Sequence, residues 1–249
     1  MTKQWLRRYN LLPFNTLDST HLEAKRLLES GISGNSVIWA ESQTSGRGRY
    51  GRRWESQCGN LYLSIILDSQ TFCAVQSQLS FVASLSVYRA ITLAATKAKK
   101  KLDLGLKWPN DVLVNGSKIS GILLESVKRK DHNYLILGIG LNIANYPTNI
   151  DRNVTSMHAL DLDEYNVTEM LNLVMESFDH YYLLWQQKGF MYIRNLWMKK
   201  IYNPQDVMTV NDGKNRISGM FQSIDHNGAI VLKLSSGQIY TFTDGEVSL

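Results

Sequence analysis

The sequence predicts an α+β fold in which a mixed β-sheet is flanked by helices and followed by a small β-barrel or sandwich. Short runs of apolar and β-branched residues, bounded by Gly, Asn or charged residues, recur up to residue 143 and predict strands. Two longer stretches repeat apolar residues every three or four positions, as one face of a helix does. Beyond residue 204 the turn sequences NDG, HNG, SSG and TDG recur at short intervals, which is typical of a small all-β domain.

Strands are expected at five places in the larger part of the chain. They are residues 37–40, 60–67, 111–114, 118–125 and 134–143. The third and fourth runs flank Asn115-Gly116, which is the strongest short signal for a hairpin. Together with the helices, these runs predict a mixed sheet with helices packed on it.

The helical pattern is clearest in residues 76–100, where Leu79, Val82 and Leu85 share one face. A second helical pattern covers residues 167–197 and is interrupted by Gly189. Because the sequence pattern changes from helical to that of short strands after this stretch, we place a domain boundary near Ile201. The expected domains are residues 1–200 and residues 201–249.

Composition and charge narrow the class of protein. With 44% hydrophobic and 20% charged residues, the 249-residue chain is expected to fold. Its net charge of +5 favours anionic partners such as nucleotides or carboxylates. Cys58 and Cys73 stand alone, which argues against a disulfide framework or a zinc site and fits a reducing compartment. The N-terminus has no continuous apolar stretch and the longest apolar run is broken by glycines, so we expect a cytoplasmic protein without a membrane span.

Residues 45–54, SGRGRYGRRW, hold three glycines and four arginines. Glycines let backbone amides approach an anion closely, and arginines bind carboxylate or phosphate through paired hydrogen bonds, so the segment predicts an anion-binding loop. Gly46, Gly48 and Gly51 also spell GxGxxG. A dinucleotide-binding turn, however, needs a helix to begin at the third glycine, and here the chain runs on into a strand. The remaining alternative is a solvated basic loop.

The expected hairpin around Asn115-Gly116 brings an acid and a base together. If those two residues form the turn, the pairs are Val114 with Ser117, Leu113 with Lys118, Val112 with Ile119, and Asp111 with Ser120. Asp111 and Lys118 then become diagonal neighbours on one face. A surface salt bridge is one explanation. The position of Lys118 next to the otherwise apolar run ISGILLE instead favours a functional role for the lysine.

Near the N-terminus, LDST at residues 17–20 precedes an amphipathic stretch. Asp18, Ser19 or Thr20 would cap the helix that follows, and the hydroxyls would equally bind a polar ligand group there. The histidines at positions 21, 132, 158, 180 and 226 have no spacing that fits a metal site or a catalytic triad. We therefore assign none of them a catalytic role.

These segments, in this order, resemble the biotin protein ligase family. The resemblance covers nearly the whole chain and rests on LDST at 17–20, AESQTSGRGRYGRRW at 40–54, KWPNDVLVNGSKISGILLE at 107–125 and GIGLNI at 138–143. The pair GRGRxGRxW and KWPND is highly specific. The family's fold is a mixed sheet flanked by helices, distantly similar to class II aminoacyl-tRNA synthetases, and residues 201–249 are expected to form its SH3-like barrel.

The resemblance implies roles for individual residues. Those implied to bind biotin are Ser19, Thr20, Gln43, Gly46, Arg47, Gly48, Arg49, Lys118 and Gly121. Ser19, Thr20 and Gln43 would hold the ureido end. The catalytic set would be Lys118, Arg47 and Arg49, with Lys118 bridging the biotin carboxylate and the α-phosphate of ATP.

The nucleotide would be held by a second group of residues. Trp54 would stack on adenine, while Asn110, Asp111 and Asn142 would position ATP, with Asp111 as the expected Mg²⁺ ligand. Where the family often has STN, this chain has Ser19-Thr20-His21. That departure puts a ligand contact from His21 in doubt.

The activity implied by the resemblance is that of a ligase using ATP and Mg²⁺. It would convert biotin to biotinyl-5′-AMP and transfer the biotinyl group to a lysine of the biotin carboxyl carrier protein or domain of a biotin-dependent carboxylase. The chemistry fits the arginines and Lys118, because a carboxylate that attacks the α-phosphorus of ATP brings two anions together. The first alternative is a lipoate or octanoate ligase of the same fold.

The second alternative is a non-catalytic RNA-binding module. It predicts stacked aromatics on an exposed sheet among basic residues, whereas the C-terminal part has only Phe221, Tyr240 and Phe242 amid few charges. Because sixteen residues precede Leu17, too few for a helix-turn-helix module, we expect no sequence-specific DNA binding. A homodimer is a further expectation. The C-terminal turns carry charged groups, which we expect to serve ATP or acyl transfer rather than biotin: Asp212, Lys214, Asp225, Asp244 and Glu246.

Overall fold

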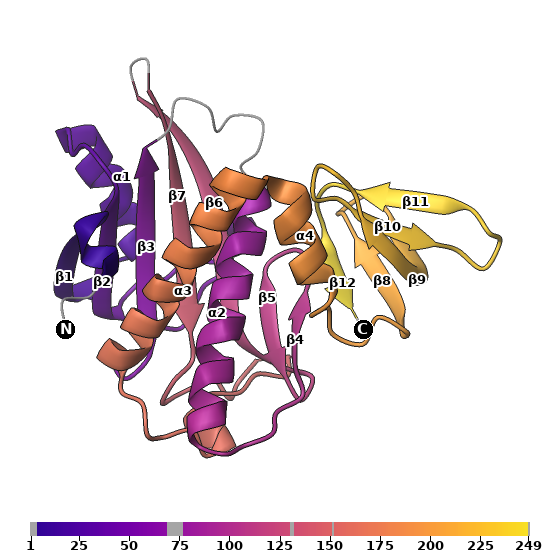
Figure 1. The fold of residues 1–249 in the computed structure, drawn as a ribbon, viewed down its shortest axis with the longest axis horizontal. Helices are drawn as coiled ribbons and strands as arrows, with labels where there is room; N and C mark the ends of the chain where they lie inside the picture. The colour runs from indigo at the N-terminus through magenta and orange to yellow at the C-terminus, as the bar shows by residue number, and fades with distance from the viewer. Residues whose placement is uncertain (1–3, 69–76, 130–131, 151, 249) are drawn as a thin grey trace.

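Two β-sheets organise the chain in a computed structural model that describes residues 4–68, 77–129, 132–150 and 152–248. The first sheet has seven strands in the order β1-β2-β3-β7-β6-β5-β4 and the second has five in the order β11-β10-β9-β8-β12 (Figure 1). β1 and β2 run parallel and every other neighbouring pair in the first sheet is antiparallel, so the predicted mixed sheet is confirmed. Cys73 and the first residue of the predicted helix 76–100 lie outside the described residues.

The strands of the first sheet are β1 (Asn10–Leu17), β2 (Ser36–Gln43), β3 (Leu61–Asp68), β4 (Leu104–Lys107), β5 (Asp111–Val114), β6 (Ser117–Arg129) and β7 (His132–Leu141). Those of the second are β8 (Val207–Asn211), β9 (Arg216–Ile224), β10 (Ile230–Lys233), β11 (Ile239–Phe242) and β12 (Glu246–Ser248). The helices are α1 (Thr20–Ser30), α2 (Gln78–Lys97), α3 (Val167–Lys188) and α4 (Phe190–Met198), with short 3₁₀ turns at η1 (Gln4–Arg7), η2 (Arg49–Gly51) and η4 (His158–Leu160).

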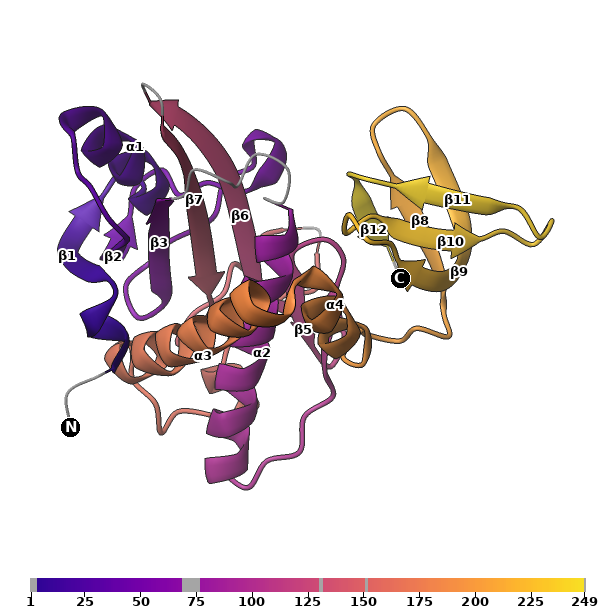
Figure 2. The same cartoon turned by 45° about the horizontal axis from the view of Figure 1, so that its top comes forward.

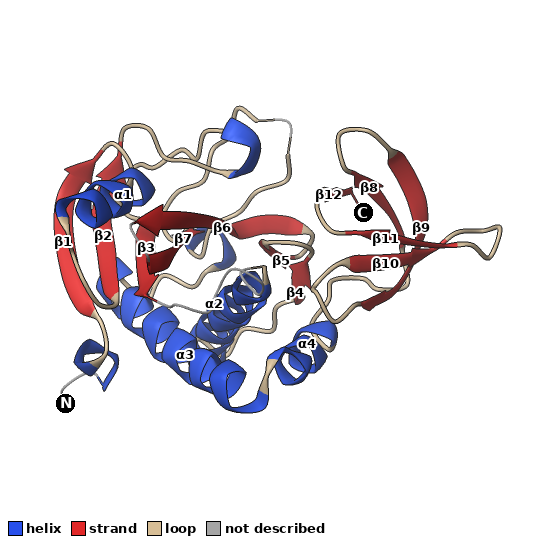
Figure 3. Cartoon of the chain, turned by 90° about the horizontal axis from the view of Figure 1, so that it is seen from above, coloured by secondary structure: helices blue, strands red, loops and turns tan. Residues whose placement is uncertain are grey.

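The first sheet separates two layers of helices. Alternate side chains of β3 and β7, such as Leu63 and Leu137, enter the main core with α2 and α3. The intervening residues, such as Ile66 and Ile136, pack in a smaller core with α1. Figure 3 shows α2 and α3 on one side of the sheet and α1 on the other. The face that carries α1 is therefore only partly covered, which leaves room for a site.

The two predicted helical stretches are confirmed. The first is α2, in which 14 of the 20 residues are buried. α2 is long and apolar enough to cross a membrane, but 72% of its most apolar window is buried inside the fold, as in the core helix of a globular protein. The second stretch divides at Gly189 into α3 and α4, as expected from a glycine whose φ is 75°.

The predicted hairpin turn is confirmed, but half of its register is wrong. Val114 pairs with Ser117 and Leu113 with Lys118, as predicted, and then a bulge shifts the ladder so that Val112 pairs with Ser120 and Asp111 with Gly121. The extra residue in β6 is Ile119, which turns into the main core. Asp111 and Lys118 nevertheless meet on one face.

The C-terminal strands form an antiparallel sheet, in agreement with the expected small β-domain and consistent with an SH3-like barrel. It lies beside α4 and β5 in Figure 1 and Figure 2, and Figure 1 also shows β4 at this edge of the first sheet. The indole Nε1 of Trp108 donates to the carbonyl of Gly228 at 2.9 Å, and Phe81 packs near the same glycine. A buried hydrogen bond and an aromatic contact therefore fix the second sheet against the first.

Candidate active site

A cavity of about 290 Å³ opens on the α1 face of the first sheet, close to the volume typical of small-molecule sites. All of the site residues predicted from the sequence except Gly46 line it. They come from the start of α1, the end of β2, the arginine-rich loop, β5, β6 and the segment after β7. Segments far apart in the sequence therefore converge on one site.

The floor of the cavity is made by Gly121 of β6 and by Gly138 and Gly140 of β7. A Cβ at Gly140 would lie 2.6 Å from Cε2 of Trp54, and one at Gly121 would lie 3.0 Å from its Cζ3. The two glycines thus let the indole lie flat against the sheet. Trp54 Nε1 is buried and has no hydrogen-bond partner among the described residues. Gly138 and Gly140 were not predicted as site residues, although they alternate with Ile139 within an apolar strand.

The deep end of the cavity is polar. Ser19 caps α1 by accepting a hydrogen bond from the amide of His21 at 3.2 Å. The side-chain oxygen Oε1 of Gln43 accepts a hydrogen bond from the backbone amide of Thr20 at 2.8 Å and another from the Thr20 hydroxyl at 3.1 Å. The Thr20 hydroxyl also lies 2.9 Å from that of Ser64 on β3. The two interpretations of LDST, a helix cap and a ligand site, are therefore compatible, because Ser19 and Thr20 both line the cavity.

His21, for which a ligand contact was in doubt from the sequence, belongs to the same wall. Its side chain is buried, and Nε2 lies 3.0 Å from a carboxylate oxygen of Glu125, which also pairs with Lys25 at 2.6 Å. Burial lowers the pKa of His21 below its ordinary value, against the opposing effect of Glu125. The imidazole is therefore neutral at neutral pH.

The cationic part of the site is centred on Lys118. Its Nζ lies 2.5 Å from Asp111 Oδ1 and 5.4 Å from the centroid of the Trp54 ring. Lys107 Nζ approaches the other Asp111 oxygen at 3.6 Å, and burial lowers the pKa of Lys107. The backbone of Lys118 is fixed by hydrogen bonds from its amide to the carbonyl of Asn153 and from the amide of Thr155 to its carbonyl.

The two predicted asparagines also line the cavity. Asn110 donates to the carbonyl of Ile122 at 2.6 Å, and its side-chain oxygen accepts from Arg49 at 3.3 Å. Asn142 is buried and donates to the carbonyl of Thr155 at 3.0 Å. Both asparagines therefore stabilise the walls of the site.

The arginine-rich segment folds into a narrow turn over the mouth of the cavity. The backbone amide of Trp54 donates to the carbonyl of Gly46 at 2.9 Å, and the amide of Gly48 donates to the carbonyl of Arg52 at 2.8 Å. Gly46 does not line the cavity; any side chain there would collide with the carbonyl of Trp54 and with Ser56, so a glycine is required. Tyr50 has a φ of 57°, a conformation that non-glycine residues adopt infrequently.

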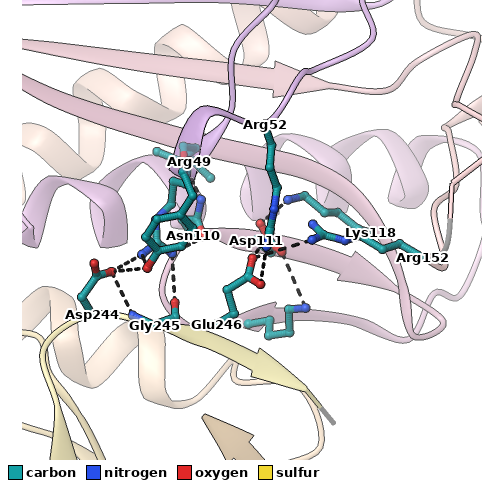
Figure 4. A network of polar contacts seen from close by, with 12 residues as sticks. Arg49, Arg52, Asn110, Asp111, Lys118, Arg152, Asp244, Gly245 and Glu246 are labelled. Carbon is teal, nitrogen blue, oxygen red and sulfur yellow. Dashed lines mark hydrogen bonds and ion pairs between the residues drawn. The ribbon is translucent and has the colours of Figure 1, made fainter. Parts of the chain in front are cut away.

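The C-terminal sheet contributes acids to this loop. Arg49 pairs with Asp244 and also donates to the carbonyl of Gly245 at 3.2 Å, while Arg52 pairs with Glu246 (Figure 4). Arg152, which the sequence analysis did not identify, lies 3.8 Å from Glu246 and lines the cavity. Of the five charged residues of the C-terminal turns that were expected to serve ATP or acyl transfer, only Glu246 lines the cavity among the described residues. Asp225 instead accepts from the amides of Asn227 and Ala229 in its own turn.

Comparisons with known proteins agree with this geometry. The model of the biotin/lipoate A/B protein ligase family matches residues 13–142. A biotin–[acetyl-CoA-carboxylase] ligase of Paracoccus denitrificans is 34% identical over 89% of this chain and 93% of its own length. The bifunctional ligase/repressor of Escherichia coli K12 is 30% identical over 94% of this chain and 72% of its own length.

Among solved structures, the biotin protein ligase of Aquifex aeolicus in complex with biotin and ATP is similar at a TM-score of 0.81 and 30% identity. The similarity covers 96% of this chain and 97% of that one. The resemblance expected from the motifs is thus confirmed by sequence and by structure. The chain belongs to the biotin/lipoate A/B protein ligase family.

Proposed function

We propose that this chain is a biotin protein ligase that forms biotinyl-5′-AMP from biotin and ATP and then biotinylates a lysine of a carboxylase carrier domain. The observation that carries the proposal is the division of one cavity into a neutral polar end and a cationic end. Ser19, Thr20 and Gln43 stand at the first, and Lys118 stands at the second with the loop arginines. Biotin has the same division, with a ureido ring at one end and a carboxylate at the other.

In the first step, a biotin carboxylate oxygen attacks the α-phosphorus of ATP, and the bond to pyrophosphate breaks. Two anions must approach, so the main requirement is neutralisation and alignment of charge. We assign this role to Lys118 with Arg47 and Arg49. In the second step, the amine of the acceptor lysine attacks the acyl carbon, AMP leaves, and the amine gives up a proton. The loop excludes water that would otherwise hydrolyse the mixed anhydride.

The donor set at the nucleotide end is compatible with Mg²⁺. Asp111 offers a carboxylate and Asn110 an amide oxygen, and Mg²⁺ commonly binds one or two carboxylates together with substrate phosphates. Within the described ranges, no group of three or more His, Cys, Asp or Glu side chains could hold a metal. We assign Asp111 to Mg²⁺ carried by ATP, where the ion would offset phosphate charge. Trp54, Asn110 and Asn142 are assigned to the nucleotide.

The same family includes ligases for lipoate, and the deep end of the cavity discriminates between the two substrates. A dithiolane or an octanoyl chain offers no hydrogen bonds to a wall of hydroxyls, an amide and an imidazole, and buried polar groups left without partners are costly. The RNA-binding alternative has no comparable support. Its expected aromatics, Tyr240 and Phe242, stack on each other at 5.7 Å, and Phe242 is buried.

Other parts of the assignment are proposals about the chain as a whole. We assign residues 1–200 to the catalytic domain and residues 201–249 to the SH3-like barrel. We also propose a cytoplasmic location, a homodimeric state and no sequence-specific DNA binding. Sedimentation at several protein concentrations tests the dimer, and a mobility-shift assay with DNA fragments tests DNA binding.

Substrate-dependent exchange of labelled pyrophosphate into ATP tests the function. Purified protein is given ATP and Mg²⁺ with biotin, lipoate or octanoate in separate reactions. We expect exchange with biotin, and transfer of biotin to an added carrier domain. Exchange that requires lipoate or octanoate instead would assign the chain to the other branch of the family, and no exchange with any acid would refute the ligase assignment.

A further inference from the structure

The imidazole of His21 has one nitrogen bonded and one unused. Nε2 faces Glu125 at 3.0 Å, whereas Nδ1 is buried and has no hydrogen-bond partner among the described residues. His21 is 3% exposed and lines the cavity. A Cβ built on Gly138 would lie 3.4 Å from this Nδ1, so the nitrogen lies over the glycine floor. A buried polar atom without a partner at a ligand cavity indicates a ligand contact.

The neighbours of His21 determine which kind of partner Nδ1 requires. A carboxylate accepts hydrogen bonds, so the imidazole proton of the neutral ring lies on Nε2 and is donated to Glu125. Lys25, at 2.6 Å from Glu125, keeps that carboxylate charged. Nδ1 therefore carries a lone pair and accepts. The missing partner must be an N–H or O–H donor.

Few acceptors remain at the deep end of the cavity. The carbonyl oxygen of Gln43 already accepts two hydrogen bonds from Thr20, and its amide donates one to Ser56 at 2.8 Å. Gln43 thus has one N–H left for a ligand carbonyl. The Ser19 hydroxyl accepts from the amide of His21 and keeps its own O–H as a second donor. Among the described residues, acceptors that remain at this end include the hydroxyl oxygens of Thr20 and Ser64, and His21 Nδ1. These donors and acceptors match a cyclic urea, which has one carbonyl and two N–H groups.

We propose that His21 is a specificity-determining residue whose Nδ1 accepts a hydrogen bond from one ureido N–H of biotin, with Glu125 as the positioning residue that fixes its tautomer. This inference rests on the proposed function. Substrates without an N–H at the ring, such as lipoate or octanoate, leave the nitrogen unpaired and are disfavoured. A histidine thus contributes to selectivity without transferring a proton.

Two ring analogues of biotin test the proposal, each a cyclic carbamate in which one of the two ureido N–H groups is replaced by oxygen. Binding to the full-length chain is measured by calorimetry. We expect both analogues to bind the natural chain more weakly than biotin, because each loses one hydrogen bond. His21→Phe should weaken biotin roughly tenfold, the amount expected for one neutral hydrogen bond. It should weaken only one analogue, the one that keeps the N–H facing His21.

Two further variants complete the design. His132→Phe changes an exposed histidine at the start of β7 and should bind biotin normally. Glu125→Gln lets a side-chain amide donate to Nε2 and move the imidazole proton to Nδ1, so it should weaken biotin in the same analogue-specific way. Glu125→Gln also tests the proposal in the case that His21→Phe does not fold.

The outcomes separate the inference from the proposed function. Absence of biotin binding by the natural chain would refute the ligase assignment. The role of His21 alone would be overturned if the natural chain binds biotin normally and the folded variants either lose affinity equally for biotin and both analogues or lose none.

Discussion

Lys118 is held in place before any substrate arrives. Its ammonium is paired with Asp111 at 2.5 Å, and its backbone is bonded to residues 153 and 155. Asp111 also lies near Lys107, so the cluster holds two lysines for one acid. The excess positive charge stays in a half-buried wall and is available to an incoming carboxylate or phosphate. Such preorganised charge stabilises a transition state without the cost of moving into position.

Lys118→Ala is expected to reduce adenylation at least about a hundredfold, which corresponds to roughly 3 kcal/mol of transition-state stabilisation. The fold should survive, because Asp111 keeps Lys107 as a partner. Pyrophosphate release and thermal melting are measured in parallel. Lys128→Ala, at an exposed position of the same strand, is the matched control. Near-normal release by Lys118→Ala would remove the lysine from its assigned role.

The buried imidazole makes a prediction about pH. Burial lowers the pKa of His21 below 6.5, Glu125 opposes this, and Lys25 and Arg47 add to it. The unfolded chain therefore binds the proton more readily than the folded one. The resulting stability is complete above about pH 6.5 and is lost as the pH falls through the lower folded-state pKa.

Melting curves between about pH 8 and about pH 5 should therefore fall more steeply for the natural chain than for His21→Phe. Biotin affinity should weaken in the same direction, because a protonated Nδ1 cannot accept. Identical pH profiles for both chains would show that His21 does not titrate in this range.

At the residue scale, the sequence predicted the meeting of Asp111 and Lys118 although part of the assumed register was wrong. Asn115-Gly116 determines the turn, but nothing in the local sequence marks the bulge at Ile119, whose position depends on packing against the main core. The contact between His21 and Glu125 was missed for a similar reason. The two residues lie 104 positions apart, so no spacing rule could connect them.

Among the elements, the arginine-rich turn depends on its barrel contacts as much as on its own hydrogen bonds. Arg49 and Arg52 meet Asp244 and Glu246 in an exposed setting, and such pairs contribute about 0–1 kcal/mol each. The turn is thus held weakly, as a closing element should be. Ligand anions that bind the arginines would stabilise the closed form by mass action.

Trypsin provides a direct measurement of this closure, because Arg47, Arg49, Arg52 and Arg53 are cleavage sites. We expect cutting within residues 46–53 to slow several-fold when biotin and ATP are saturating. Cutting at Lys214, in an exposed turn of the second sheet, serves as the internal control and should not change. Equal rates at the loop with and without ligands would contradict ligand-dependent closure.

Elements were predictable where periodicity was strong and were missed where it was weak. The buried helix α2 and the strands β3 and β7 follow clear patterns, and their positions were predicted closely. β1 was missed because its sequence NLLPFNTL contains a proline and, at the edge of the sheet, none of its residues is fully buried. β4 was missed because it is only four residues long and includes a glycine. That glycine, Gly105, lies so close to Tyr202 that a Cβ would be 2.7 Å from the tyrosine ring.

For the whole molecule, the C-terminal sheet acts on the site through charge. Its last strand and the turn before it bring Asp244 and Glu246 to arginines that the ligand anions would also use (Figure 4). We therefore expect these carboxylates to compete with substrate for the arginines in the free enzyme, and also to support the closed loop. The sequence predicted that these acids serve ATP or acyl transfer, but it did not reveal their arginine partners, because those contacts depend on how the two sheets pack, for example through Trp108 and Gly228.

Glu246→Gln separates these two effects. If competition dominates, loss of the negative charge frees Arg52 and Arg152 for phosphate, and KM for ATP should fall by up to about fivefold, within the energy of an exposed ion pair. In the same variant, tryptic cutting of the ligand-free loop should accelerate, because the loop loses its partner. Asp225→Asn, which alters a barrel carboxylate engaged in its own turn, is the control for general effects on the barrel. KM for biotin should stay within about twofold in both variants, because His21, Thr20 and Gln43 are unchanged. A rise in KM for ATP combined with faster cutting would mean that the barrel acid mainly supports the closed loop, and the competitive role would then be wrong.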